Sequence, residues 1–168
     1  LKNSLKITMS GIKYFPQKLN VKGKKIIVRV DLNVPLKDKK IQDPTRILQV
    51  LPFLQDLIKR KSKIILISHL GRPKGVRNGD LSLLPIYKYL KGKLNTNMYF
   101  YTGEINNEVK IKCSYLKESE VLLIENIRFF KEETENDENF SKKLGELGDI
   151  YINDAFSCSH RKQSSICN

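Results

Sequence analysis

The chain has 168 residues, of which 40% are hydrophobic and 29% are charged, as in an ordinary soluble globular domain. This length suffices for one domain with a proper core. No apolar run approaches the roughly 18 residues of a membrane-spanning helix, and the start has no secretory signal pattern. The 3 cysteines include no CxxC pair. The count argues against a disulfide framework and for a reducing cytoplasm.

The net charge is +13, from 31 Lys and Arg against 18 Asp and Glu. One interpretation is an anionic partner: a nucleic acid, a membrane surface or a phosphorylated metabolite. The other is a coding bias, because AT-rich DNA also gives chains rich in Lys, Ile and Asn. The lysines form no stripe with interleaved aromatic residues, the pattern of nucleic-acid platforms. We therefore expect no nucleic-acid partner and no membrane partner.

The first half of the chain predicts two strands and two helices after an irregular extension over residues 1–19, within which Met9 is an alternative start to Leu1. Apolar β-branched runs predict strands at 26–30 and 63–67. Helical spacing of apolar residues predicts a helix over 44–60, with Asp43 as its N-cap and a kink at Pro52. Ser82 is predicted to cap a second helix that runs to about Leu94.

The second half repeats this alternation. It predicts strands at 97–102, 120–124 and 150–152 and a weak helix at 105–112. The acidic run from Glu132 to Glu138 predicts the solvated start of one helix to Leu147, with Gly148 as its C′ residue. Alternating strands and helices with continuous apolar strands predict an α/β fold: a parallel sheet with helices on both faces, a Rossmann-like three-layer sandwich. Residues 20–168 form this one domain, which we expect to be truncated, because no closing element precedes Asn168.

Polar residues follow four of the predicted strands, at the carboxyl ends that a parallel sheet brings to one edge. Arginine occurs at these ends and at the start of the first helix, in a chain that otherwise prefers Lys. Guanidinium groups bind phosphate and carboxylate bidentately. Each residue alone could be ordinary turn chemistry, but the set predicts a pocket for a small polyanion. Its members are Asp31, Asn33, Arg46, His69, Arg72, Asn126, Arg128, Asn153, Asp154, His160 and Arg161.

Dinucleotide and P-loop fingerprints are absent from the sequence, since neither GxGxxG after the first strand nor GxxxxGK[ST] occurs. Five segments instead occur in a recognisable order: VRVDLNVPL at 28–36, QDPTRI at 42–47, SHLGRPKG at 68–75, LLIENIRFFKEE at 122–133 and INDAFSCSHR at 152–161. Over about residues 20–165 the chain closely resembles the amino-terminal half of phosphoglycerate kinases.

The resemblance implies a cytoplasmic, monomeric, two-domain kinase of glycolysis that transfers the acyl phosphate of 1,3-bisphosphoglycerate to ADP, giving 3-phosphoglycerate and ATP. It implies that Asp31 and Asn33 hold the hydroxyl and carboxylate end of the glycerate, and that Arg46 is the catalytic arginine. It also implies a basic patch for the substrate phosphate, formed by His69, Arg72, Arg128 and Arg161, with His160 in support. Mg²⁺ with ATP or ADP would be bound mainly by a carboxyl-terminal domain that this chain lacks.

The chain departs from the family pattern in three places. Phe130 stands where a His is common, Ser157-Cys158-Ser159 replaces a more usual Gly-Thr-Ala, and Lys162-Gln163 replaces a small residue and a His. Without the nucleotide domain we expect weak binding of 3-phosphoglycerate and no turnover. The alternative is a non-catalytic basic α/β module that binds phosphorylated ligands or nucleic acid. A Rossmann-type oxidoreductase lacks its glycine fingerprint, and a degraded gene product would not be expected to keep the substrate motifs.

Overall fold

A computed structural model describes residue 16, residues 18–154 and residues 163–167. Five parallel strands form one sheet in the order β5-β6-β4-β1-β7. The strands are β1 (Lys25–Arg29), β4 (Lys63–Ile67), β5 (Met98–Tyr101), β6 (Val121–Ile124) and β7 (Ile150–Asn153). The predicted α/β class and parallel sheet are confirmed.

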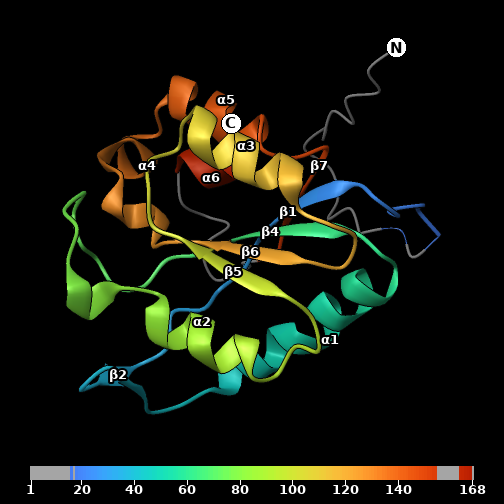
Figure 1. Ribbon diagram of the computed structural model, residues 1–168. Coiled ribbons are helices and arrows are strands. Elements are labelled where there is room, and N and C mark those ends of the chain that lie inside the picture. The colour runs from blue at the N-terminus through green and yellow to red at the C-terminus, as the bar shows by residue number, and fades with distance from the viewer. Residues whose placement is uncertain (1–15, 17, 155–162, 168) are drawn as a thin grey trace.

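Helices cover both faces of the sheet, which confirms the three-layer arrangement (Figure 1). One face carries α1 (Thr45–Lys59) and α2 (Leu84–Lys91). The other carries α3 (Asn107–Tyr115), α4 (Lys131–Glu135), α5 (Glu138–Gly145) and α6 (Ser164–Cys167). Successive strand residues point to opposite faces, so each strand contributes to two cores. Ile26 and Val28 of β1 join the core under α1 and α2, and Ile27 joins the core under α3 and α5.

The first two helices begin close to the predicted residues. The N-cap of α1 is Pro44 rather than the predicted Asp43, because the helix begins at Thr45. The Asp43 carboxylate still accepts hydrogen bonds from the backbone N–H (2.9 Å) and hydroxyl (2.6 Å) of Thr45. Pro52 lies inside α1. Ser82 Oγ accepts from Leu84 N (3.1 Å) at the start of α2. That helix ends at Lys91 rather than near Leu94, because the chain turns at Gly92.

The predicted single helix over 132–147 is wrong. Asn136 adopts a left-handed conformation (φ 58°) that ends α4, and the Asp137 side chain caps α5 by accepting from Phe140 N (2.7 Å). The acidic run is also not wholly solvated, since Glu133 is fully buried. Gly148 is not a C′ residue, because α5 ends at Gly145. It packs against β1, where an added Cβ would lie 2.7 Å from Ile27 Cγ1.

Short elements that the sequence did not predict connect the larger ones. The basic loop after β1 forms a two-stranded hairpin of β2 (Leu36–Lys37) and β3 (Lys40–Ile41). Two 3-10 turns, η1 (Gly79–Leu81) and η2 (Ile127–Phe129), follow β4 and β6. Both lie in the connections at the carboxyl ends of the strands, where the polar residues of the predicted pocket gather.

Candidate phosphate-binding site

The candidate site lies at the carboxyl ends of β1, β4 and β6, which are neighbours in the sheet. Ser68, the residue after β4, joins the first two of these ends. Its hydroxyl donates to Val30 O (2.8 Å) and accepts from Leu32 N (3.0 Å). Ser68 O also accepts from Ile127 N (3.1 Å), which ties the end of β6 to the same point. A buried serine thus holds three loops in register.

Asp31 and Arg46 contact each other directly, as the predicted topology requires. Arg46 Nη1 lies 2.6 Å from Asp31 Oδ2, and Asp31 Oδ1 accepts from Asn33 N (3.0 Å). The Arg46 side chain remains 49% exposed at the start of α1, whereas the Asp31 side chain is 16% exposed. Such a solvent-accessible pair contributes only about 0–1 kcal/mol. An anionic ligand can therefore replace Asp31 as the partner of Arg46 at small cost.

Gly71 lies at the centre of the remaining contacts. Its N–H donates to Asn33 Oδ1 (2.9 Å), and its carbonyl accepts from Arg128 Nη1 (2.9 Å). The backbone there is left-handed (φ 60°), and an added Cβ would lie 2.7 Å from a Leu81 methyl group. Glycine is the residue that this conformation and this spacing both favour. The side chains predicted to bind substrate thus also fix the loop that presents Arg72.

Glu125 and Asn126, which directly follow β6, hold this loop through hydrogen bonds. Asn126 Nδ2 donates to Leu70 O (2.7 Å) and Leu81 O (2.8 Å). The Glu125 carboxylate accepts from Ser82 Oγ (2.6 Å), Leu83 N (2.7 Å) and Asn126 N (2.8 Å). The sequence indicated Asn126 as a strand-end residue but gave Glu125 no role. The sequence feature that could have identified Glu125 is its place in a polar pair, Glu125-Asn126, directly after an apolar run.

The predicted basic residues differ in exposure. Arg72 is exposed, whereas His69 and Arg128 are 3% and 4% exposed. Burial limits their direct contact with a ligand, and their role in phosphate binding stays a prediction. His160, Arg161 and the substituted Ser157-Cys158-Ser159 segment lie outside the described residues. Phe130, at the first departure from the family pattern, is buried with its ring 5.3 Å from that of Phe140.

A second, buried polar cluster lies beneath the site. Arg29 is fully buried in β1, and its Nε donates to Ser165 Oγ (2.7 Å). Ser165 donates in turn to the Glu133 carboxylate through Oγ (2.5 Å) and N (2.8 Å). Arg29 Nη2 lies 4.0 Å from Glu133 Oε1. Burial raises the pKa of Glu133, while the bonds from Ser165 and the nearby Arg29 charge oppose that rise.

No group of three or more His, Cys, Asp or Glu side chains in the described part of the chain could hold a metal ion. Within these same residues no helix is long and apolar enough to cross a membrane.

A parallel α/β domain with basic groups at the strand ends belongs to the class of α/β proteins whose ligands bind at the carboxyl edge of the sheet. Comparison with known proteins narrows the class. The family model for phosphoglycerate kinase matches residues 17–168. Phosphoglycerate kinases of Dictyoglomus turgidum and Wolbachia pipientis are 47% and 46% identical, over 87% and 86% of this chain.

Solved structures agree with the sequence relatives. The phosphoglycerate kinase of Coxiella burnetii superposes with a TM-score of 0.80 at 37% identity and that of Pyrococcus horikoshii with 0.78 at 31%, each over 89% of this chain. The chain belongs to the phosphoglycerate kinase family. It spans 37% and 36% of the Dictyoglomus and Wolbachia relatives, and 37% and 38% of the two solved chains.

Proposed function

We propose that this chain is the glycerate-binding, amino-terminal half of a cytoplasmic, monomeric phosphoglycerate kinase. In the whole enzyme the acyl phosphate of 1,3-bisphosphoglycerate passes to ADP, giving 3-phosphoglycerate and ATP. The observation that carries the proposal is the convergence on one sheet edge of the Asp31–Arg46 pair with the Gly71 loop, which Asn33 and Arg128 hold. Family membership supports the reaction, and this geometry supports the assignment of the glycerate to this edge.

Each side chain has a role that its chemistry allows. The Asp31 carboxylate accepts from the glycerate hydroxyl, and the Asn33 amide donates to the glycerate carboxylate or ester oxygens. Arg72, Arg128 and Arg161 neutralise the substrate phosphate, with His69 and His160 beside them. Arg46, the exposed member of its pair, moves to the phosphoryl group in transfer and is the catalytic residue.

The proposed mechanism needs no nucleophile from this half. The bond between the acyl oxygen and phosphorus breaks as a bond from the ADP β-phosphate oxygen to phosphorus forms. The protein contributes position and positive charge, which supply most of phosphoryl-transfer catalysis. ADP, ATP and Mg²⁺ belong mainly to a second domain. This chain alone is therefore proposed to bind 3-phosphoglycerate weakly and to be inactive. ATP formation by the purified chain in a coupled assay would contradict the second statement.

Isothermal titration calorimetry with 3-phosphoglycerate tests the binding role. Arg72→Ala should weaken binding at least about tenfold, because it removes a charge-assisted contact of about 1.5–3 kcal/mol. Lys88→Ala removes an equal charge from the exposed face of α2 and should change binding less than about twofold. Equal effects of the two substitutions would contradict a specific pocket.

A salt titration separates the proposal from its rival. A basic module for nucleic acid would bind duplex DNA with an affinity that falls steeply with salt and varies little with sequence. The glycerate site should instead discriminate 3-phosphoglycerate from glycerate at constant ionic strength. Tight DNA binding without any response to 3-phosphoglycerate would favour the rival.

A further inference from the structure

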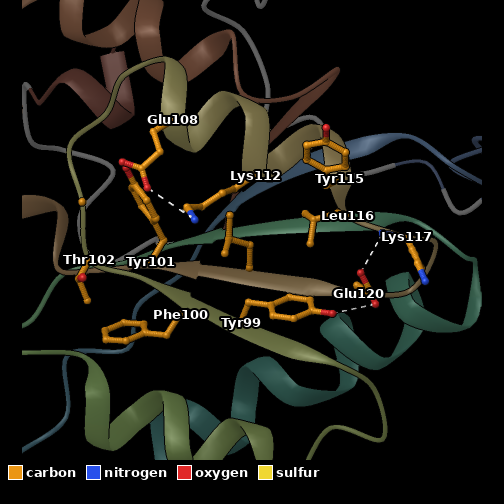
Figure 2. Close-up of a pocket in the computed structure, with 12 residues that line it drawn as sticks. Tyr99, Phe100, Tyr101, Thr102, Glu108, Lys112, Tyr115, Leu116, Lys117 and Glu120 are labelled. Carbon is orange, nitrogen blue, oxygen red and sulfur yellow. Dashed lines mark hydrogen bonds and ion pairs between the residues drawn. The ribbon is translucent and has the colours of Figure 1, made fainter.

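A cleft of about 600 Å³ opens at the β5 edge of the sheet, between β5 and α3 (Figure 2). Tyr99 and Tyr101 of β5 and Leu122 of β6 line it on the sheet side, and Leu116 and Tyr115 line it on the helix side. Cavities of about 300–1,000 Å³ with mostly apolar walls and few polar groups are typical of small-molecule sites. None of these residues belongs to the candidate phosphate-binding site.

The aromatic walls of the cleft are held in place before any ligand binds. Tyr99 OH donates to Glu120 Oε1 (3.1 Å), and Tyr101 OH donates to Glu104 O (2.9 Å). Both hydroxyl groups are thus fixed, although the Tyr99 residue stays 45% exposed. Tyr115 is 80% exposed. Tyr101 is only 5% exposed, and Lys112 Nζ lies 5.9 Å from its ring centroid. Tyr99 therefore offers a ring that is both fixed and accessible, which binds a flat ligand with little loss of conformational entropy.

The polar groups of the cleft select the ligand. At one end Lys112 lies 3.5 Å from Glu108, so the two charges offset each other. At the other end Glu120 accepts from Asn97 Nδ2 (3.0 Å) and Tyr99 OH through Oε1, and from Lys117 N (2.9 Å) through Oε2. A carboxylate oxygen has two lone pairs, so Oε2 can accept a further hydrogen bond.

The ionisation of Glu120 agrees with such a role. Burial raises the pKa of Glu120, but the hydrogen bonds from Lys117 N, Asn97 and Tyr99 outweigh burial and lower it overall. The carboxylate therefore carries its charge at neutral pH, although Glu120 is only 6% exposed. This geometry favours a donor and disfavours an anion.

We propose that the cleft bounded by Tyr99, Tyr101, Tyr115 and Glu120, here named the tyrosine cleft, binds a planar aromatic molecule that carries N–H donors. The ring stacks on the exposed tyrosine rings, those of Tyr99 and Tyr115. Its N–H groups donate to Glu120 Oε2. An aromatic heterocyclic amine or amidine has both properties, whereas a ring with a carboxylate lacks the second.

An NMR titration with 2-aminobenzimidazole tests the proposal. Amide signals of residues 99–103 and 112–120 should shift, with a dissociation constant of about 1 mM or tighter, as fragments of this size give. Benzimidazole-2-carboxylate keeps the rings and the ring N–H but replaces the exocyclic amino donor with an anionic group, and it should bind at least about tenfold more weakly. Guanidinium chloride at the same concentration has donors without a ring and should leave these signals unmoved.

Two substitutions and one control complete the experiment. Tyr115→Ala changes an exposed side chain, preserves the fold and should weaken binding at least about fivefold through lost stacking. Glu120→Gln should weaken it at least about tenfold. Ile111→Ala, an exposed apolar change on the same helix, should have no effect. Absence of shifts at about 10 mM ligand, tighter binding of the carboxylate, or affinities unchanged in both Tyr115→Ala and Glu120→Gln would overturn the proposal.

Discussion

The buried Arg29–Glu133 pair offers a direct test of how the site is supported. Glu133→Gln removes one charge and leaves the guanidinium of Arg29, a residue with 0% exposure, without its counter-ion. Ser165 donates to both Glu133 oxygens in the native protein. The new amide keeps one acceptor oxygen and replaces the other by an NH2 group, which cannot accept. The substitution therefore removes the charge together with one of the two hydrogen-bond acceptors.

The expected loss of stability is large. Two unit charges 4.0 Å apart attract by about 4 kcal/mol at the effective dielectric constant of about 20 that suits protein sites. Breaking buried pairs by removing one partner costs about 3–5 kcal/mol in measured cases. Domains of this kind are stable by about 5–15 kcal/mol. Burial raises the pKa of Glu133 and so offsets part of this attraction. The uncompensated Arg29 charge and the lost acceptor should still make Glu133→Gln cost about 1–3 kcal/mol of the free energy of unfolding.

Urea unfolding followed by circular dichroism measures this loss. With a denaturant dependence of about 2 kcal/mol per M, the midpoint should fall by about 0.5–1.5 M. Glu135→Gln is the matched control, because Glu135 lies in the same helix but pairs with Lys131 at the surface (3.1 Å). It should cost less than about 1 kcal/mol.

A second variant shows whether the charge itself is responsible. Arg29→Met with Glu133→Leu replaces both charges by apolar groups and should recover most of the stability that the single change loses. If Glu133→Gln changes stability by less than about 0.5 kcal/mol, the assigned interaction is wrong. The same holds if the double variant is no more stable than the single one.

Three further predictions follow from individual contacts. The pKa of Glu120 is lowered in the folded protein, so its stabilisation is present above its ordinary pKa and is lost as pH falls through the folded-state pKa. As pH falls below about 4.5, the urea midpoint of Glu120→Gln should therefore fall less than that of the charge-matched Glu118→Gln. Equal falls of the two midpoints with pH would refute this. Burial raises the pKa of the Cys113 thiol to about 11. In a variant with Cys158 and Cys167 replaced by Ser, iodoacetamide at about pH 8 should modify Cys113 at least about 100-fold faster in the urea-unfolded protein than in the folded protein. Similar rates in the two states would count against a buried thiol. Gly71→Ala should lower the free energy of unfolding, measured in urea, by at least about 1–2 kcal/mol and should weaken 3-phosphoglycerate binding. Gly79→Ala places its Cβ in open space and should leave binding unchanged. Equal stability and equal binding of the two variants would show that Gly71 has no special role.

The strands and layers of this fold were predictable because the signals are local. Continuous apolar runs mark β1, β4 and β6, which are buried on both faces. The hairpin of β2 and β3 gave no such signal, because its turn places Asp38 and Lys39 at positive φ without a glycine. The break at Asn136 has a local signal, an Asn-Asp pair, but the surrounding acidic run predicts the start of a single helix.

The part of the candidate site that could be predicted is the part that follows from topology, because a parallel sheet brings the carboxyl ends of its strands to one edge. Asp31 and Arg46 meet as expected, since the helix after β1 must start at that edge. The part played by Gly71 depends on tertiary contacts with Asn33 and Arg128, which no local pattern reveals. The Arg29–Glu133 pair likewise joins a strand to a helix far along the chain. The sequence pattern around Arg29, a charge inside an apolar run, therefore does not identify Glu133 as its partner.

The central claim is that 3-phosphoglycerate binds at the carboxyl ends of β1, β4 and β6. An NMR titration of the 168-residue chain with 3-phosphoglycerate measures this directly. Amide signals of residues 31–33, 69–72 and 126–128 should shift together with one dissociation constant, and those of the tyrosine cleft should stay in place. Shifts confined to other surfaces, or none with saturating ligand, would contradict the account.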